Sequence, residues 1–535
     1  MARVLLWSAT ADFLQRVRSK GFLVAALAMV VVATLYLPAL DAPYATVTVG
    51  GDRGLYDSAW IGAVTACLNC AFFSLAAFYL VRGSVGRDEE TRFGQILAAT
   101  PVGKVEYVLG KTLSNFAYLA TLTGIIALSG AAIQLVRAED LAVNPVELLL
   151  PTVIVAWPVM LLISAVAVLF ECVPLLGGGL GSVAYFALYV GVVVLSLTPG
   201  VHSSAPDPLG VRMALEQMAR SADAAPNLGI NPAPPNLGTF DFGGLGWNAA
   251  ELMSRLAWSG AAIPMVLAAA AFFSRFDPAR GPGTSSSKPF WRRRRAAAPD
   301  ATDRRRPRAA RSTAPSPTST AHAKGGTLLT PLVERSVRER FFPLVLAELR
   351  LMLKGRSRWW HLGALGLVVA GFAVPLEAAR GVVLPLAWLW PLLVWSPVGS
   401  REVRYGVSEI LVSAPRVRSR APLAAFTAGA IVAGLAASGV AINMGLSGNL
   451  RGLVALVSGA LFVSALAVAC GVLSGASVLF EGLYLPLWYL GPFNKLSALD
   501  FAGAGGAGHP FTYLALAAAL VCATLAALRR GEGSR

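Results

Sequence analysis

Two short sequence patterns each occur twice in this chain, in the same order and at almost the same spacing. Glu90-Thr91-Arg92-Phe93-Gly94 returns 312 residues later as Glu402-Val403-Arg404-Tyr405-Gly406. Val168-Leu169-Phe170-Glu171 returns 310 residues later as Val478-Leu479-Phe480-Glu481. Similarity at one fixed period indicates a duplicated structural unit. The sequence therefore predicts two copies of one unit, joined head to tail.

The composition indicates what kind of unit is duplicated. Hydrophobic residues make up 56% of the chain and charged residues only 14%, whereas soluble domains have about a quarter charged residues. Apolar runs of about 18 or more residues predict transmembrane helices. We expect an all-α polytopic membrane protein with two tandem six-helix transmembrane repeats. The expected spans are about 21–39, 58–81, 113–136, 150–170, 181–199 and 256–274, then about 362–379, 382–398, 422–446, 453–479, 482–497 and 511–528.

Basic residues beside the expected spans set their orientation, because Lys and Arg are concentrated on the cytoplasmic side. They precede the first span and follow the second, the sixth and the last spans, at Arg16, Arg18, Lys20, Arg82, Arg87, Arg92, Lys104, Lys111, Arg292 to Arg295, Arg529 and Arg530. All share one face if the N- and C-termini are both cytoplasmic. Six spans per copy then give both repeats the same orientation, with a pseudo-twofold axis along the membrane normal.

The chain divides into three regions. Residues 1–275 form the first six-span unit, which includes a basic interfacial N-terminal helix and a long outer loop at 200–255. Residues 276–340 are expected to be a disordered basic cytoplasmic linker, because their composition cannot bury enough apolar surface to fold. Residues 341–535 form the second unit. We expect the linker's arginines to contact anionic membrane lipids rather than nucleic acid.

The sequence contains no catalytic constellation. No pair of its four histidines has metal-ligand spacing, and there is no nucleophile-elbow pattern. Gly110-Lys111-Thr112 ends like a phosphate-binding loop, but the glycine that this loop needs five positions earlier is replaced by Val105. We therefore predict no catalytic residue, no metal and no cofactor in this chain.

The recurring charged loops between the second and third spans of each copy are the main candidate sites. They are either solvated hairpins whose charges fix the topology or docking surfaces for a soluble partner. The repetition of the same residue types favours docking. The other candidates are Glu171 and Glu481, each at the end of an apolar run. A carboxylate there is either a functional group of the membrane domain or a boundary residue that reaches water, and both interpretations stay open.

Several further stretches carry a family resemblance. They are Arg16-Val17-Arg18-Ser19-Lys20, Tyr44-Ala45-Thr46 to Ser58-Ala59-Trp60, Arg87-Asp88-Glu89-Glu90-Thr91 running into Ala99-Thr100-Pro101-Val102, Leu109-Gly110-Lys111, Arg275-Phe276-Asp277-Pro278 and Pro385-Leu386-Ala387-Trp388-Leu389-Trp390. In these stretches the chain resembles an ABC-2-type transporter permease, the membrane part of an ATP-binding-cassette exporter. The resemblance covers nearly the whole chain except the linker.

The resemblance implies a transport subunit without its own ATPase site, located in a prokaryotic inner or plasma membrane. ATP and Mg would be bound by separate ABC ATPase subunits, in two copies, on the cytoplasmic face. The single chain would be equivalent to a permease dimer. The residues implied in ATPase coupling are Glu90, Arg92, Phe93 and Gly94 in the first copy and Glu402, Arg404, Tyr405 and Gly406 in the second.

Three other classes of protein compete with this interpretation. An ion-gradient-driven secondary carrier of the major-facilitator type also has six plus six spans, but it needs protonatable residues within the membrane. The expected spans 21–39 and 453–479 contain no acidic or basic residue, which weighs against a carrier. A membrane enzyme acting on lipid would need clustered acids or histidines at one face. A sensor or anchor would have no evident need for the repeat.

Overall fold

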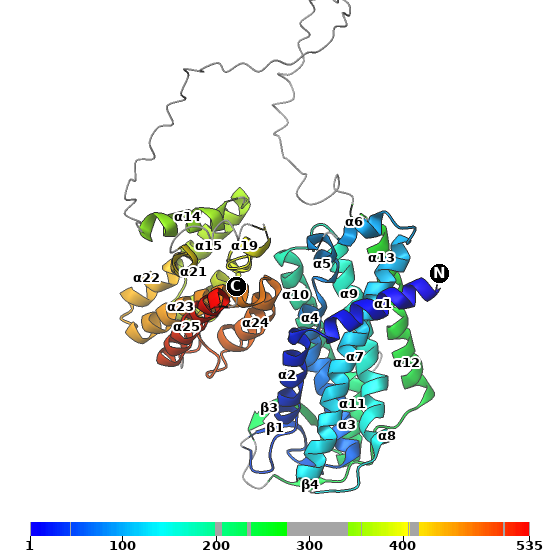
Figure 1. Ribbon diagram of the computed structural model, residues 1–535. Helices are drawn as coiled ribbons and strands as arrows, with labels where there is room; N and C mark the ends of the chain where they lie inside the picture. The colour runs from blue at the N-terminus through cyan, green and yellow to red at the C-terminus, as the bar shows by residue number, and fades with distance from the viewer. Residues whose placement is uncertain are drawn as a thin grey trace, which may run out of the picture.

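The computed structural model of the 535-residue chain describes residues 2–42, 44–91, 93–137, 139–197, 206–232, 237–274, 276, 341–354, 356–404, 406, 417–506 and 509–533. All structural statements below concern these residues. The described part consists mainly of helices, and it includes two small two-stranded sheets (Figure 1).

The first half of the chain forms a helical bundle with a small extension at one end. Its helices are α1 (Ala2–Val17), α2 (Lys20–Tyr36), α3 (Ser58–Leu68), η1 (Asn69–Phe73), α4 (Ser74–Val81), α5 (Ser84–Glu90), α6 (Phe93–Ala98), α7 (Lys104–Arg137), α8 (Pro145–Pro151), η2 (Thr152–Ala156), α9 (Trp157–Cys172), α10 (Gly179–Leu197), α11 (Val211–Ala222), α12 (Ala249–Gly260) and α13 (Ala262–Phe272). The segments labelled η are π-helical turns within longer helices, a distortion that is frequent at functional sites.

The second half forms a shorter bundle beside the first (Figure 1). Its helices are α14 (Phe341–Leu353), α15 (Arg358–Ala373), α16 (Leu376–Ala378), η4 (Ala379–Val383), α17 (Leu384–Leu389), α18 (Leu392–Trp395), α19 (Arg401–Arg404), α21 (Val417–Ala436), α22 (Ser438–Leu446), α23 (Leu450–Ser474), α24 (Val478–Trp488), η5 (Tyr489–Phe493) and α25 (Pro510–Gly533). The expectation of a predominantly helical chain is confirmed.

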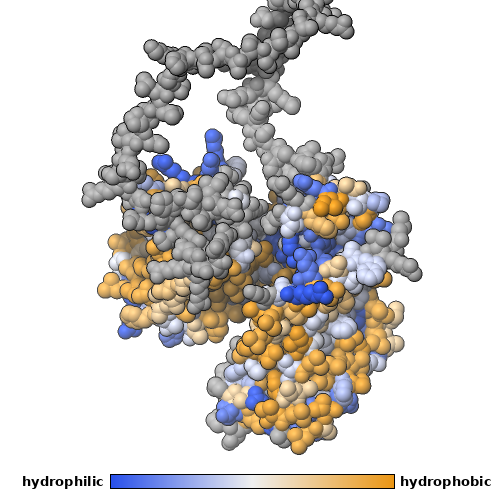
Figure 2. Space-filling model, viewed as in Figure 1, coloured by the Kyte–Doolittle hydropathy of each residue, from blue (hydrophilic) through white to orange (hydrophobic). Residues whose placement is uncertain are grey.

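Eight helices in the described residues are long and apolar enough to cross a membrane. They are Ser58–Glu89, Lys104–Arg137, Pro145–Cys172, Gly179–Leu197, Ala249–Phe272, Leu376–Trp395, Leu450–Ser474 and Pro510–Leu528. Two bent pairs raise the number to ten if each is one span: Leu6–Val17 with Gly21–Tyr36, bent by 73°, and Arg420–Ala436 with Ser438–Leu446, bent by 61°. The chain is thus a multi-pass membrane protein. Figure 2 shows apolar side chains over the flanks of both halves, as contact with lipid requires.

Two expected boundaries in the second half are wrong. The spans expected at 453–479 and 482–497 are the helices α23, which ends at Ser474, and α24 with η5, which begins at Val478. Gly475 ends α23 in the left-handed conformation with φ 67°, which glycine adopts without steric cost. The apolar run continues through this break, so hydropathy alone could not place it. The expected boundary at 256 also shifts, since α12 begins at Ala249 within the predicted outer loop.

The extension of the first half contains strands that the sequence analysis did not predict. Strand β1 (Tyr44–Val49) pairs antiparallel with β3 (Pro226–Pro232), and β2 (Arg53–Gly54) pairs parallel with β4 (Thr239–Phe240). Helix α11 packs against β1 and β3 within the expected outer loop at 200–255. The strands lie at the end of the first half opposite α5 and α6 (Figure 1). This end of the bundle therefore carries an ordered cap in place of a simple loop.

Candidate coupling region and seam between the halves

Helices α5 and α6 hold the first copy of the repeated charged pattern at one end of the bundle (Figure 1). Glu171, in the last turn of α9, fixes the start of α5. Its carboxylate accepts hydrogen bonds from the backbone N–H groups of Gly83, Ser84, Val85 and Gly86 at 2.8, 3.1, 2.7 and 3.3 Å. These are the amides that a helix start leaves without partners, and a negative charge there is favoured by the helix dipole. Glu171 therefore ties α5 to the end of a membrane helix.

A buried lysine in α7 connects this helix to α1 and to α5 at the same end of the bundle. Lys111 Nζ, in α7, lies 2.8 Å from Asp12 of α1 and 3.0 Å from Asp88 of α5. Tyr107 Oη donates to Asp88 at 2.7 Å, and Arg16 pairs with Asp12 at 3.0 Å. Burial raises the pKa of Asp12, but the charges of Arg16 and Lys111 and the hydrogen bonds outweigh this and lower it to about 2. The basic N-terminal helix is thus held to α5 and α7 by charge.

Gly94, in α6, lies beneath an aromatic cluster. A Cβ atom at this position would come within 2.6 Å of the Phe276 ring. Phe276 packs edge-on against Tyr107 and Phe273, with ring centroids 5.4 and 5.1 Å apart. The absence of a side chain at Gly94 is therefore what lets α6 pack against this cluster.

The outward side of α6 exposes apolar side chains. Phe93 is 49% exposed and Ile96 is 63% exposed. They sit directly after the charged residues of α5, and Figure 2 shows hydrophilic residues near α5 and the junction of α1 with α2. The first copy thus presents an apolar pair beside charged groups.

Both copies of the charged pattern are described only in part. Arg92 and Tyr405 lie outside the described residues, and of Glu90 and Arg404 only the helical backbone is described. Glu402, in α19, is half-buried, and burial raises the pKa of its carboxyl group. Its neighbour Arg401 lies 3.7 Å from Glu348 of α14. Gly406 is exposed, with φ 63°.

Glu481 lies in a different setting, at the seam where the two halves meet. Its carboxylate is 3.2 Å from Arg82 Nη1, and these side chains are only 2% and 3% exposed. Glu481 also accepts hydrogen bonds from Ser182 of α10 and from Ser396, which follows α18. Arg82 Nη2 donates to the carbonyl oxygen of Leu176 at 3.1 Å. Arg82 of the first half and Glu481 of the second half are therefore both buried, and each neutralises the charge of the other.

Glu171 and Glu481, which the sequence matches with each other, lie at different places in their helices. Glu171 ends α9, whereas Glu481 lies in the first turn of α24, which follows α23. Neither carboxylate simply reaches water: Glu171 caps α5, and Glu481 pairs with Arg82.

Sequence reasoning missed Arg82, Asp12 and Lys111 as site residues. In the sequence, Arg82 is only a topology signal, and Lys111 is a topology signal and part of a stretch that carries the family resemblance. A usable signal existed: a basic residue directly after an apolar run has to find a partner when the run is buried. The identity of each partner depends on the tertiary fold.

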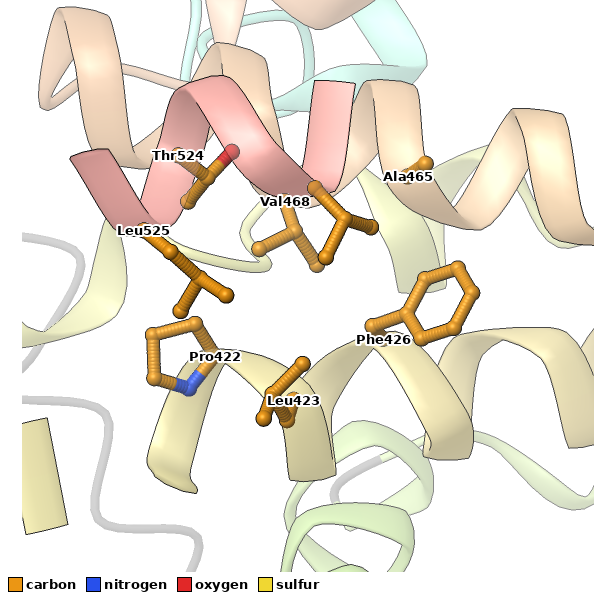
Figure 3. Close-up of a pocket in the computed structure, with 8 residues that line it drawn as sticks. Pro422, Leu423, Phe426, Ala465, Val468, Thr524 and Leu525 are labelled. Carbon is orange, nitrogen blue, oxygen red and sulfur yellow. The ribbon is translucent and has the colours of Figure 1, made fainter. Parts of the chain in front are cut away.

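A small pocket in the second half is not a candidate site. It lies between α21, α23 and α25 and is lined by Pro422, Leu423, Phe426, Ala465, Val468, Val521, Thr524 and Leu525 (Figure 3). The hydroxyl of Thr524 donates to the carbonyl oxygen of Leu520, so no polar group is free to select a ligand.

Within the described residues no group of acids, histidines and cysteines could hold a metal ion. Comparisons with protein-family models, curated proteins and solved structures found no match to this chain.

Proposed function

We propose that this chain is the membrane-spanning permease subunit of an ATP-binding-cassette exporter. It would form the translocation path, and separate ATPase subunits would supply ATP hydrolysis at the end that holds α5 and α6. The observation that carries this proposal is the arrangement of α5 and α6. These short helices stand at one end of the bundle. Helix α6 exposes Phe93 and Ile96, and α5 is bonded to three longer helices, to α9 through Glu171 and to α7 and α1 through Lys111.

This arrangement suits the transmission of force from a soluble partner. A partner that moves α5 would pull on α9 through Glu171 and on α7 and α1 through Asp88 and Lys111. The bonds are charged and mostly buried, so they are stronger than exposed ion pairs. Nucleotide binding to the partner would shift the membrane states only by its differential affinity for them.

A 6+6 organisation is part of the proposal, and several residues support it. A left-handed glycine followed by serine comes after the second helical span of each half, at Gly83 with φ 91° and at Gly399 with φ 78°. A π-helical turn interrupts both of these spans, at η1 and η4. Ser164-Ala165-Val166-Ala167-Val168 in α9 corresponds to Ser464-Ala465-Leu466-Ala467-Val468 in α23.

The test of this function is co-purification of the tagged chain from its native membrane in mild detergent. We expect an ABC ATPase at about two copies per chain. The double variant Glu90→Ala with Glu402→Ala should keep expression and lose the coupling of ATP hydrolysis to transport. Glu147→Ala with Glu377→Ala is the matched control, because both carboxylates are exposed and lie outside α5 and α19. Unchanged transport in the first double variant would refute the coupling role.

A secondary carrier is the second candidate, favoured by one observation. Glu481 is a protonatable group buried against Arg82 within the helical bundle, as proton-driven carriers require. Abolition of transport by ion uncouplers, with no ATPase in the purified complex, would favour this function instead.

A further inference from the structure

The polar cluster at the seam is contributed equally by the two halves of the chain. Arg82 and Ser182 come from the first half, and Ser396 and Glu481 from the second. Side chains 85 to 399 residues apart in sequence converge on one carboxylate and one guanidinium. The cluster is therefore a junction between the halves and not a feature of either bundle alone.

Each charge is anchored to its own half. Arg82 Nη2 is held by the carbonyl oxygens of Leu176 and Gly178, both in the first half. Glu481 Oε1 accepts from Ser396 in the second half. Separation of the halves would leave these bonds intact and would break only the bonds from Arg82 and Ser182 to Glu481.

Apolar packing seals the seam around this cluster. The ring of Phe186 lies 6.2 Å from Trp488 and 5.6 Å from Tyr489, edge-on in both cases. A Cβ atom on Gly482 would lie 2.9 Å from Cβ of Tyr79, so α24 approaches α4 closely. In this state the side chains of Arg82 and Glu481 are almost completely buried.

Among the residues that the structure describes, the seam carries a single charged pair although its elements are duplicated. Tyr185 in α10 and Tyr484 in α24 each donate to a carbonyl oxygen of the preceding broken span, at Ser74 and Trp388. If these tyrosines are equivalent, Glu481 in the second half is the counterpart of Ser182 in the first, because each lies three residues before its tyrosine. The residue before the left-handed glycine is Arg82 in the first half and Val398 in the second. The counterparts of Glu481 and Arg82 are thus Ser182 and Val398, which cannot form a second ion pair.

We propose that Arg82 and Glu481 form a single latch that closes the path between the two halves and opens in every transport cycle. The latch lies directly before α5, so Arg82 is separated only by Gly83 from the helix that Glu171 caps. Movement of α5 would reach Arg82 through the backbone. This inference rests on the proposed permease function, and it adds a gating residue pair to it.

The first test is a cross-link across the seam. Tyr79→Cys with Gly482→Cys, in a chain whose five native cysteines are replaced by alanine, puts two Cβ atoms 2.9 Å apart, so a small shift of α24 from α4 brings them to the 3.5–4.5 Å that a disulfide spans. A protease site inserted between residues 276 and 340 lets a denaturing gel report the cross-link. We expect complete cross-linking in the resting chain. Gly179→Cys with Leu393→Cys is a second pair at the same seam.

The latch itself is tested by Arg82→Gln and Glu481→Gln in each cross-linking background. We expect the rate of cross-linking to fall about tenfold or more in both, because the halves separate more often. Glu216→Gln is the control, since it removes only an exposed ion pair with Arg220. Unchanged cross-linking rates in both latch variants would overturn the proposal.

The cycle is tested on the purified complex with its ATPase. Oxidation of the cysteine pair should abolish ATP-driven turnover, and dithiothreitol should restore it. Full turnover by the oxidised complex would show that the latch does not open. Absence of any ATPase would refute the proposed permease function alone, because the cross-linking rates measure the latch without nucleotide or transport.

Discussion

At the scale of single residues, the region around α5 depends on charges that are buried beside opposite charges. Asp12 is the clearest case, because its pKa is lowered to about 2 by Arg16 and Lys111 against the effect of burial. A carboxyl group with a lowered pKa stabilises the fold above its unfolded pKa of 3.8. This contribution is lost as the pH falls through about 2.

Asp12→Asn should therefore destabilise the purified chain in a pH-dependent way. By linkage, a shift of this size is worth on the order of 2 kcal/mol at neutral pH. The difference in thermal unfolding temperature between the variant and the wild type should be constant from pH 7 to pH 5. It should then shrink as the pH is lowered below about 4, where the carboxyl group of the unfolded chain becomes protonated. A difference that stays constant to pH 3 would contradict this assignment.

Gly94 is the second residue whose role is set by a close neighbour. Gly94→Ala should push the Phe276 ring away, at a cost of about 1–3 kcal/mol for overpacking. We expect weaker retention of the partner ATPase and faster proteolysis at α6. Gly86→Ala is the matched control, since a Cβ atom there meets nothing within 4 Å and the residue lies in helix α5. Equal behaviour of the two variants would argue against the role of the aromatic cluster.

At the scale of elements, α5 is too short to be stable alone. It has seven residues, whereas isolated helices shorter than about 12–15 residues are marginal in water. Its stability has to come from contacts with the rest of the bundle: the carboxylate of Glu171, Asp88 bound to Lys111, and the buried side chain of Val85. A short helix fixed in this way can be moved as a unit by a partner.

Glu171→Ala should release α5 while leaving the membrane helices folded. The variant removes the acceptor of four backbone N–H groups, and loss of a helix cap typically costs about 0.5–2 kcal/mol. Hydrogen exchange followed by mass spectrometry should show faster exchange in peptides covering residues 83–91, with no change in α9. Glu147→Ala, at the exposed start of α8, should leave those peptides unchanged. Equally slow exchange in both variants would show that α5 does not depend on Glu171.

At the scale of the whole molecule, the sequence predicted the helical membrane class but not the contacts that join its parts. Hydropathy found α7 and α10 because long apolar runs leave few alternatives. It misplaced the break at Gly475, since the flanking residues are equally apolar. The recurrence of Val-Leu-Phe-Glu pairs Glu171 with Glu481, although Glu171 lies in the last turn of α9 and Glu481 in the first turn of α24. Four-residue matches cannot distinguish neighbouring apolar helices, whereas the bonds of Tyr185 and Tyr484 can.

The contacts between the two halves are also a property of the whole molecule. The seam joins α4 and α10 of the first half to α18 and α24 of the second, with the Arg82–Glu481 pair buried at its centre. Removal of one partner from a buried ion pair costs about 3–5 kcal/mol, because the remaining charge is left unpaired. If the seam is sufficient, the covalent connection through residues 276–340 is not needed to keep the halves associated.

Cleavage at a protease site inserted in that segment should therefore leave the two halves as one complex in mild detergent. Size-exclusion chromatography should show co-elution of the fragments from the wild type and partial separation for Glu481→Ala. Gly482→Leu, which puts a bulky side chain against Tyr79, should separate them further. Glu377→Ala, on the exposed surface of the second half, should behave as the wild type. Complete separation of the wild-type fragments would mean that the linker, and not the seam, keeps the halves together.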